Sequence, residues 1–203
     1  MSAKQILQHT EFTLWHDYDV SFRDKTIYMG SSSESYDEGE AGIDYAMAER
    51  VIKNLHILDK QVQEDGIVIK MNNPGGCTIH GLAIYDTVLS CKSHVSIIGY
   101  GHVMSMGSVI FQAADIRAMT KHCRMMLHMG QIGLSAETNN FYANVKECQK
   151  LDDMVLDIYL ARIKEKKPRF TKSQLKSKMA NDWYLGPEEA IEYGLCDRIY
   201  GQE

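Results

Sequence analysis

The sequence has few of the residues that staple or interrupt a fold. Its 203 residues include three prolines, two tryptophans and five cysteines, and no CxxC pair occurs. The cysteines are odd in number and widely spaced: Cys77, Cys91, Cys123, Cys148 and Cys196. This pattern is typical of reduced thiols and argues against a disulfide framework or a zinc site. We therefore expect no metal, no cofactor and a cytoplasmic location.

The charge and hydropathy of the sequence argue against two further classes of protein: those that bind nucleic acid and those that enter a membrane. The formal net charge is -5, so the chain lacks the overall basic footprint of a nucleic-acid-binding protein. The first twenty residues contain no apolar signal-peptide region. The longest apolar stretch, residues 95–116, is interrupted by His102 and by glycines, which favours a buried strand, turn and helix over a membrane span. We expect neither a nucleic-acid partner nor a membrane.

Strand and helix patterns alternate along the chain. Strands are predicted over residues 25–30, 66–71, 94–101, 123–129 and 195–200. Helices are predicted over residues 43–60, 78–90, 105–114, 141–164 and 186–194, with a further short helix capped by Thr171. This order predicts an α/β domain with a largely parallel sheet. The basic stretch 162–178 is interpreted as a solvated face of two helices.

Residues that could bind a ligand or take part in catalysis follow two of the predicted strands. Ligands of parallel α/β sheets bind at the carboxyl ends of the strands. The turn Asn72–Gly76 has glycines whose backbone N–H groups can face a ligand. Ser105 lies at the start of a helix, where the partial positive charge favours a developing oxyanion. Its window lacks the first glycine of a G-x-S-x-G elbow. An ordinary turn and a helix-capping serine explain these residues equally well.

A serine nucleophile needs a base and an acid that orients the base. His128, at the end of a predicted strand, suits the role of base better than His102, which lies too close to Ser105 in sequence. Spacing does not choose among the six candidate acids: Asp115, Asp152, Asp153, Asp157, Asp182 and Asp197. Asp182 is mildly favoured, since it precedes the apolar pair Trp183-Tyr184.

Four motifs occur together in one known family. "MNNPGG…AIYDT", "SMG", "MLH" and "YLGPEEAIEYGLCD" appear in the order and with the approximate spacing of the Clp protease proteolytic subunit. Over residues 25–200 the chain resembles this family of serine peptidases. The resemblance implies a serine endopeptidase with a ClpP/crotonase-like α/β fold, a largely parallel sheet with flanking helices and a protruding helical handle.

The resemblance also implies roles for individual residues. Ser105 matches the family's nucleophile, His128 its general base and Asp182 its orienting acid. Gly76 and Met106 match the residues whose N–H groups form the oxyanion hole. Met129-Gly130 follow the histidine where the family commonly has Gln-Pro.

An assembly is implied as well. Family members form stacked homo-oligomeric rings, usually heptameric, that enclose the active sites and receive unfolded polypeptides from an ATP-driven AAA+ unfoldase. On this basis residues 1–24 form an N-terminal segment, axial or partner-contacting, and residues 25–203 form the peptidase domain, with a handle helix at about 141–164. Val68 and Lys70 replace the Tyr-x-Tyr pair with which the family docks the unfoldase.

Three other interpretations stay open. A phage prohead-type maturation protease would share the catalytic residues. A catalytically silent ring subunit would share only the assembly. A crotonase-like acyl-CoA enzyme would use two backbone amides as an oxyanion hole without needing the serine, histidine and aspartate.

Overall fold

The computed structural model describes residues 3–30, 42–61, 66–130 and 137–202. The strands in these residues are β1 (Val20–Ser21), β2 (Thr26–Met29), β3 (Ile67–Asn73), β4 (Val95–Met104), β5 (Ile116–Met119), β6 (Arg124–Leu127), β7 (Trp183–Leu185) and β8 (Arg198–Ile199). The helices are α1 (Ala3–Tyr18), α2 (Tyr45–Gln61), α3 (Thr78–Ser90), α4 (Met106–Phe111), α5 (Thr138–Lys166), α6 (Lys172–Lys178) and α7 (Pro187–Glu192). The predicted α/β class is confirmed.

The described strands form one mixed sheet. Its main order is β1-β2-β3-β4-β5-β8, while β6 pairs with β4 and β7 pairs with β6. Every pairing is parallel except β1–β2 and β6–β7. The largely parallel sheet was therefore predicted correctly. The short strands β1, β5 and β7 were not predicted, because two to four residues give little periodicity. Strands β2 and β6 have only four residues each but lie inside the longer predicted segments 25–30 and 123–129.

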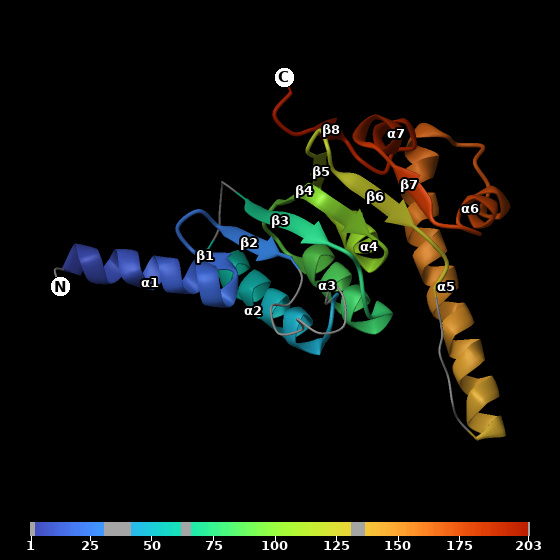
Figure 1. Cartoon of the computed structure of the whole chain (residues 1–203), viewed down its shortest axis with the longest axis horizontal. Helices are drawn as coiled ribbons and strands as arrows, with labels where there is room; N and C mark the ends of the chain where they lie inside the picture. The colour runs from blue at the N-terminus through green and yellow to red at the C-terminus, as the bar shows by residue number, and fades with distance from the viewer. Residues whose placement is uncertain (1–2, 31–41, 62–65, 131–136, 203) are drawn as a thin grey trace.

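Helices α2, α3 and α4 lie on one side of the sheet and cover its core (Figure 1). Strand β3 alternates buried and less buried positions, so that Ile67, Ile69 and Met71 face the interior. On the helices, Leu55 and Phe111 are fully buried. The hydrophobic side chains thus occupy the space between these three helices and the central strands, as two-layer packing requires.

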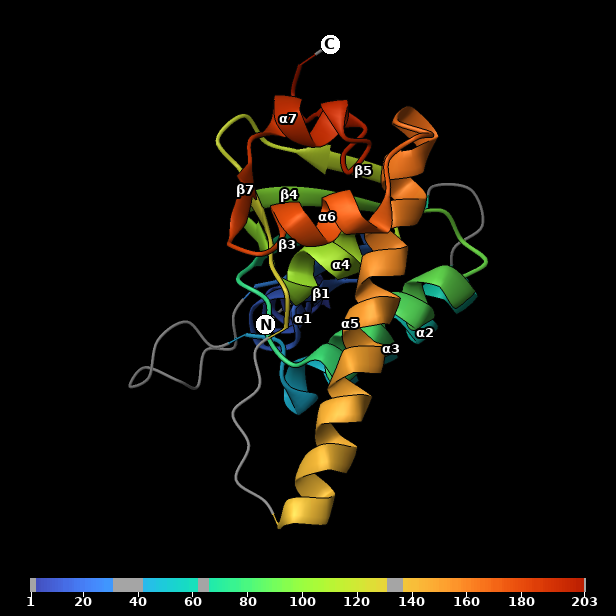
Figure 2. The same ribbon diagram turned by 90° about the vertical axis from the view of Figure 1, so that its right-hand side faces the viewer.

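Helix α5 extends three residues before and two residues after the predicted range 141–164. Its buried residues, Leu156, Tyr159 and Ile163, recur at helical spacing and lie in its C-terminal half. The other half projects beyond the body of the molecule (Figure 2). Thr171 caps the following helix α6 as predicted, with its Oγ1 accepting the Gln174 N–H at 3.2 Å.

The N-terminal helix α1 was not predicted. Among its residues Ile6, Leu7 and Phe12 are exposed, so the pattern lacks the buried stripe by which a helix is recognised. Strand β1 follows α1 within the predicted N-terminal segment 1–24, and it pairs with β2 of the predicted peptidase domain. The division at residue 24 stays a prediction. No helix among the described residues is both long and apolar enough to cross a membrane.

A buried arginine ties the C-terminal strand to the centre of the fold. Arg117 on β5 is 3% exposed. Its Nη2 lies 2.5 Å from Asp197 Oδ1, and its Nη1 donates to Gln112 Oε1 and to the Gly194 carbonyl. Because a buried guanidinium is costly without partners, these bonds fix the approach of β8 to β5.

We expect Asp197→Ala to lower the free energy of unfolding by about 3 kcal/mol, because it leaves the buried Arg117 charge without its ion-pair partner. Glu192→Ala, which removes the solvent-exposed partner of Lys167, is the matched control and should change stability far less. Urea unfolding of both variants measures the difference. Equal midpoints for the two variants would contradict the structural role given to Arg117.

Candidate active site

The predicted site residues come from the ends of four neighbouring strands. Strands β3, β4 and β6 are parallel neighbours, and β7 runs antiparallel beside β6. Gly76 follows β3, Ser105 follows β4, His128 follows β6, and Asp182 directly precedes β7. Carboxyl ends of parallel strands meet at one edge of the sheet, and the amino end of an antiparallel strand meets them there. The topology thus gathers all four residues.

Ser105 occupies a sharp turn between β4 and α4. Its φ of 48° and ψ of -125° lie where a side chain other than glycine is strained. Its N–H donates to the Met126 carbonyl at 2.8 Å, which continues the pairing of β4 with β6 for one residue. This hydrogen bond stabilises the strained conformation. The serine side chain consequently leaves the regular strand geometry, as it does in a nucleophile elbow.

His128 is hydrogen-bonded to the serine. The distance between His128 Nε2 and Ser105 Oγ is 2.8 Å, within the range of a nucleophile–base pair. His102, the alternative base, lies on β4 rather than in the turn, and its N–H donates to Asn72 Oδ1 at 2.9 Å. The structure therefore brings His128, not His102, to the Ser105 hydroxyl.

Asp182 faces the other nitrogen of the imidazole. The β6–β7 register pairs Leu127 with Trp183, so the next position outward sets His128 opposite Asp182. Asp182 Oδ1 lies 3.7 Å from His128 Nδ1, an ion-pair distance but longer than a hydrogen bond. The Asp182 side chain is 50% exposed, and Tyr184 donates its hydroxyl to Oδ2 at 3.4 Å.

The remaining aspartates of the sequence analysis have other partners. Asp115 accepts from Val95 N–H, Asp152 from Gly130 N–H and Asp197 from Arg117, while Asp153 and Asp157 both pair with Lys172. Within the part of the chain that the structure describes, Asp182 is thus the candidate acid that faces the imidazole. Spacing along the chain could not make this choice because it depends on the β6–β7 register.

The glycine turn after β3 packs directly against the serine. A Cβ placed on Gly75, whose φ is +110°, would overlap the Cβ of Ser105. The fully buried Asn73 shapes the turn: its Oδ1 accepts the Gly75 N–H at 2.8 Å and its Nδ2 donates to the Gly30 carbonyl at 2.6 Å. Glycine is required here because the two backbones approach so closely.

Among the described residues, no hydrogen-bond acceptor is found for the backbone N–H of Gly76 or of Met106. Gly76 forms a β-bridge with Ile43, but the hydrogen bonds of that bridge use the Gly75 carbonyl and the Cys77 N–H. Met106 is the first residue of α4, so its N–H has no acceptor inside the helix. Its side chain is buried against Gly81 of α3, which anchors this peptide.

Sequence reasoning missed three buried polar residues of the site. Asn73 lies in the turn but was not given a role of its own. Ser108 and Tyr159 are buried and joined by a 2.6 Å hydrogen bond beneath the serine. Tyr159 directly follows Ile158 of the predicted apolar stripe, so a tyrosine among core residues was the available signal for a buried polar contact.

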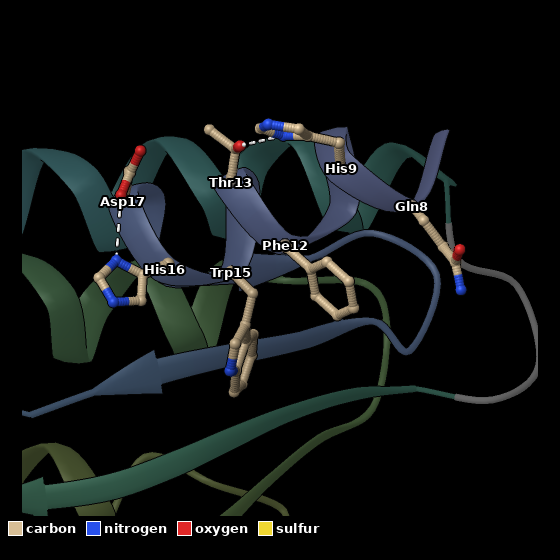
Figure 3. Close-up of a pocket in the computed structure, with 7 residues that line it drawn as sticks. All are labelled: Gln8, His9, Phe12, Thr13, Trp15, His16 and Asp17. Carbon is tan, nitrogen blue, oxygen red and sulfur yellow. Dashed lines mark hydrogen bonds and ion pairs between the residues drawn. The ribbon is translucent and has the colours of Figure 1, made fainter. Parts of the chain in front are cut away.

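A pocket of about 570 Å³ lies elsewhere, along α1. Figure 3 shows Phe12 and Trp15 pointing toward the strands, while His9 bonds to Thr13 on the outer side of the helix. Helix α1 and helix α4 stand at different ends of the sheet (Figure 1), so this pocket is separate from Ser105. No group of three potential metal ligands occurs among the described residues.

Comparison with known proteins agrees with the resemblance of the motifs. The model of the Clp protease family matches residues 38–203, which include every predicted site residue. The chain belongs to the Clp protease family. A curated Clp relative from Deinococcus radiodurans, the "ATP-dependent Clp protease proteolytic subunit", is 35% identical over 187 residues, covering 91% of this chain and 84% of that protein. The family and the fold inferred from the sequence are confirmed.

We expect Gly75→Ala to reduce cleavage of a short fluorogenic peptide by about 10²-fold, because the added methyl group displaces Ser105. Gly201→Ala is the matched control: its φ is also positive, at +81°, but no atom lies within 4 Å of the new Cβ. Both rates are measured well below the melting temperature of each variant. Full activity of Gly75→Ala would show that cleavage does not depend on the close packing of this turn against Ser105.

Proposed function

We propose that this chain is a serine endopeptidase whose nucleophile is Ser105. The observation that carries the proposal is the 2.8 Å contact between Ser105 Oγ and His128 Nε2 at the carboxyl edge of the sheet. With Nδ1 protonated and facing Asp182, Nε2 of a neutral His128 accepts the hydroxyl proton. Membership of the Clp protease family supports the same chemistry.

The reaction proceeds through an acyl-enzyme. Ser105 Oγ attacks the carbonyl carbon of the scissile bond while His128 takes its proton, and the N–H groups of Gly76 and Met106 receive the oxyanion. His128 then protonates the leaving amine as the C–N bond breaks. A water molecule, activated by the same imidazole, attacks the ester and releases the second product.

Asp182 is assigned the role of orienting acid. The carboxylate keeps the Nδ1–H tautomer and stabilises the imidazolium that forms during attack. At 3.7 Å the pair must approach by under ~1 Å to form a hydrogen bond, and such contacts commonly tighten when substrate binds. The exposure of Asp182 leaves the carboxylate free to make this movement.

We propose further that the chain assembles into stacked homo-oligomeric rings of seven subunits that degrade unfolded polypeptides delivered by an AAA+ unfoldase. The relative from Deinococcus radiodurans is described as the proteolytic subunit of an ATP-dependent protease, which supports this proposal. The projecting half of α5 also supports it, since Phe141 and Tyr142 are 40% and 63% exposed there. Exposed aromatic side chains on a projecting helix favour contact with another subunit.

We expect Ser105→Ala to lower peptidase activity by roughly 10⁴–10⁶-fold, because the nucleophile is lost while the oxyanion donors remain. A fluorophosphonate probe should label wild-type Ser105 and fail to label the variant. Ser90→Ala, at the exposed end of α3, is the control and should keep both activity and labelling. Retained cleavage by Ser105→Ala would refute the assignment, and an assembled wild type without labelling would indicate a silent subunit.

We expect native mass spectrometry to show particles of seven or fourteen copies of the 23.1 kDa chain. Dilution should lower the specific activity together with the fraction of assembled particles, because the proposed chamber exists only in the assembly. A stable monomer that cleaves peptides at the same rate as the assembled sample would contradict the chamber, although not the role of Ser105.

A further inference from the structure

Two buried hydroxyl groups lie beneath the serine turn. Ser108 Oγ is 2.7 Å from the Ser105 carbonyl oxygen and 2.6 Å from the Tyr159 hydroxyl, while the direct distance from Tyr159 to that carbonyl is 3.4 Å. Each hydroxyl has one proton to donate. Ser108 Oγ also lies 3.2 Å from the Met126 carbonyl, a longer contact than that with the Ser105 carbonyl. The two shortest contacts are satisfied together when Tyr159 donates to Ser108 and Ser108 donates to the Ser105 carbonyl.

The carbonyl that receives this proton belongs to a peptide of the proposed oxyanion hole. The C=O of Ser105 and the N–H of Met106 are parts of one planar peptide unit, in which they point in opposite directions. Holding the carbonyl on the buried side therefore aims the Met106 N–H away from the core. A hydrogen bond to the carbonyl also polarises the peptide and strengthens the N–H as a donor.

The backbone hydrogen bonds of α4 alone hold the Ser105 carbonyl only weakly. Ser108 N–H and Val109 N–H reach the Ser105 carbonyl at 2.9 and 3.3 Å, but both come from a helix of only six residues. The φ of 48° and ψ of -125° at Ser105 are strained for a residue with a side chain, so the turn requires contacts that hold it in place. The Ser108 hydroxyl is an additional donor on α4, and its contact with Tyr159 of α5 anchors it outside that helix, which resists relaxation of the strained peptide.

We propose that Tyr159 and Ser108 are positioning residues that orient and polarise the Ser105–Met106 peptide for oxyanion binding. This inference rests on the proposed function and names two positioning residues of the same site. Because Tyr159 lies on α5, the relay connects the projecting helix to the nucleophile turn, 54 residues apart in the chain.

The environment of Tyr159 suits a fixed donor. The residue is 1% exposed, and burial raises the pKa of its hydroxyl, so the proton stays on the oxygen throughout the working pH range. Its neighbours one helical turn away, Leu156 and Ile163, are apolar and fully buried. The Tyr159 hydroxyl thus has the Ser108–Ser105 pair as its polar contact among the described residues.

The test compares Tyr159→Phe, Ser108→Ala and the double variant with Tyr100→Phe. The control removes a tyrosine hydroxyl from β4, the strand that leads to Ser105, but the Tyr100 ring contacts Tyr200 rather than the site. For each protein kcat and KM are measured on a short peptide, with native mass and melting temperature recorded alongside. Affinity for a peptide aldehyde, whose adduct places an oxyanion in the hole, is the second readout.

We expect Tyr159→Phe and Ser108→Ala each to lower kcat about tenfold with KM changed less than twofold, since the loss falls on an interaction made in the transition state. Aldehyde affinity should fall in parallel, and native mass should be unchanged. The kcat of the double variant should be no lower than that of the less active single variant, because both substitutions break the same relay of hydrogen bonds. Tyr100→Phe should match the wild type.

Unchanged kcat and aldehyde affinity in an assembled Tyr159→Phe would overturn the inference while leaving the proposed function intact. If the fold-loss of kcat in the double variant equals the product of the two single losses, the two hydroxyl groups act independently and the relay is refuted. Should Tyr159→Phe fail to assemble, Ser108→Ala by itself carries the same comparison. A wild type without peptidase activity or probe labelling is the distinct outcome that refutes the proposed function itself.

Discussion

The parallel pairing of β4 with β6 is the contact on which the site depends. Its register sets Met104 beside Met126, and the N–H of Ser105 continues it by donating to the Met126 carbonyl. This bond holds the serine turn at the level where β6 ends and His128 begins. A change of register would move the Ser105 and His128 side chains to different faces or different heights, because side-chain direction alternates along a strand.

The second constraint is that Gly75, which packs against Ser105, has no side chain. Gly75 allows the turn after β3 to touch Ser105, and Asn73 fixes that turn by bonding to the amide of Gly75 and to the carbonyl of Gly30. The glycine supplies the space and the buried asparagine supplies the order. Together they fix the turn that also carries Gly76, whose backbone amide is proposed for the oxyanion hole.

A chain of polar contacts, buried except at Asp197, extends from this site toward the C-terminal strand. Asp197 pairs with Arg117, which donates to Gln112, and Gln112 in turn donates to the carbonyl of Ser108. Helix α4 is therefore bonded near both ends, although it has only six residues. Such networks are costly when incomplete and stabilise a unique arrangement when every member is satisfied, which suits a short helix that directly follows Ser105.

The sequence by itself determined the alternation of elements, the glycine turn and the helix cap at Thr171, because these follow from local periodicity and backbone preferences. It also carried the motifs that identified the family. Spacing along the chain could not distinguish Asp182 from the other aspartates, a choice that came from the family resemblance, and nothing in the sequence revealed that Tyr159 contacts Ser108, since both contacts join residues about fifty positions apart. Only the tertiary structure decided these contacts: strand register and helix packing set which distant side chains meet, and neither leaves a local signal in the chain.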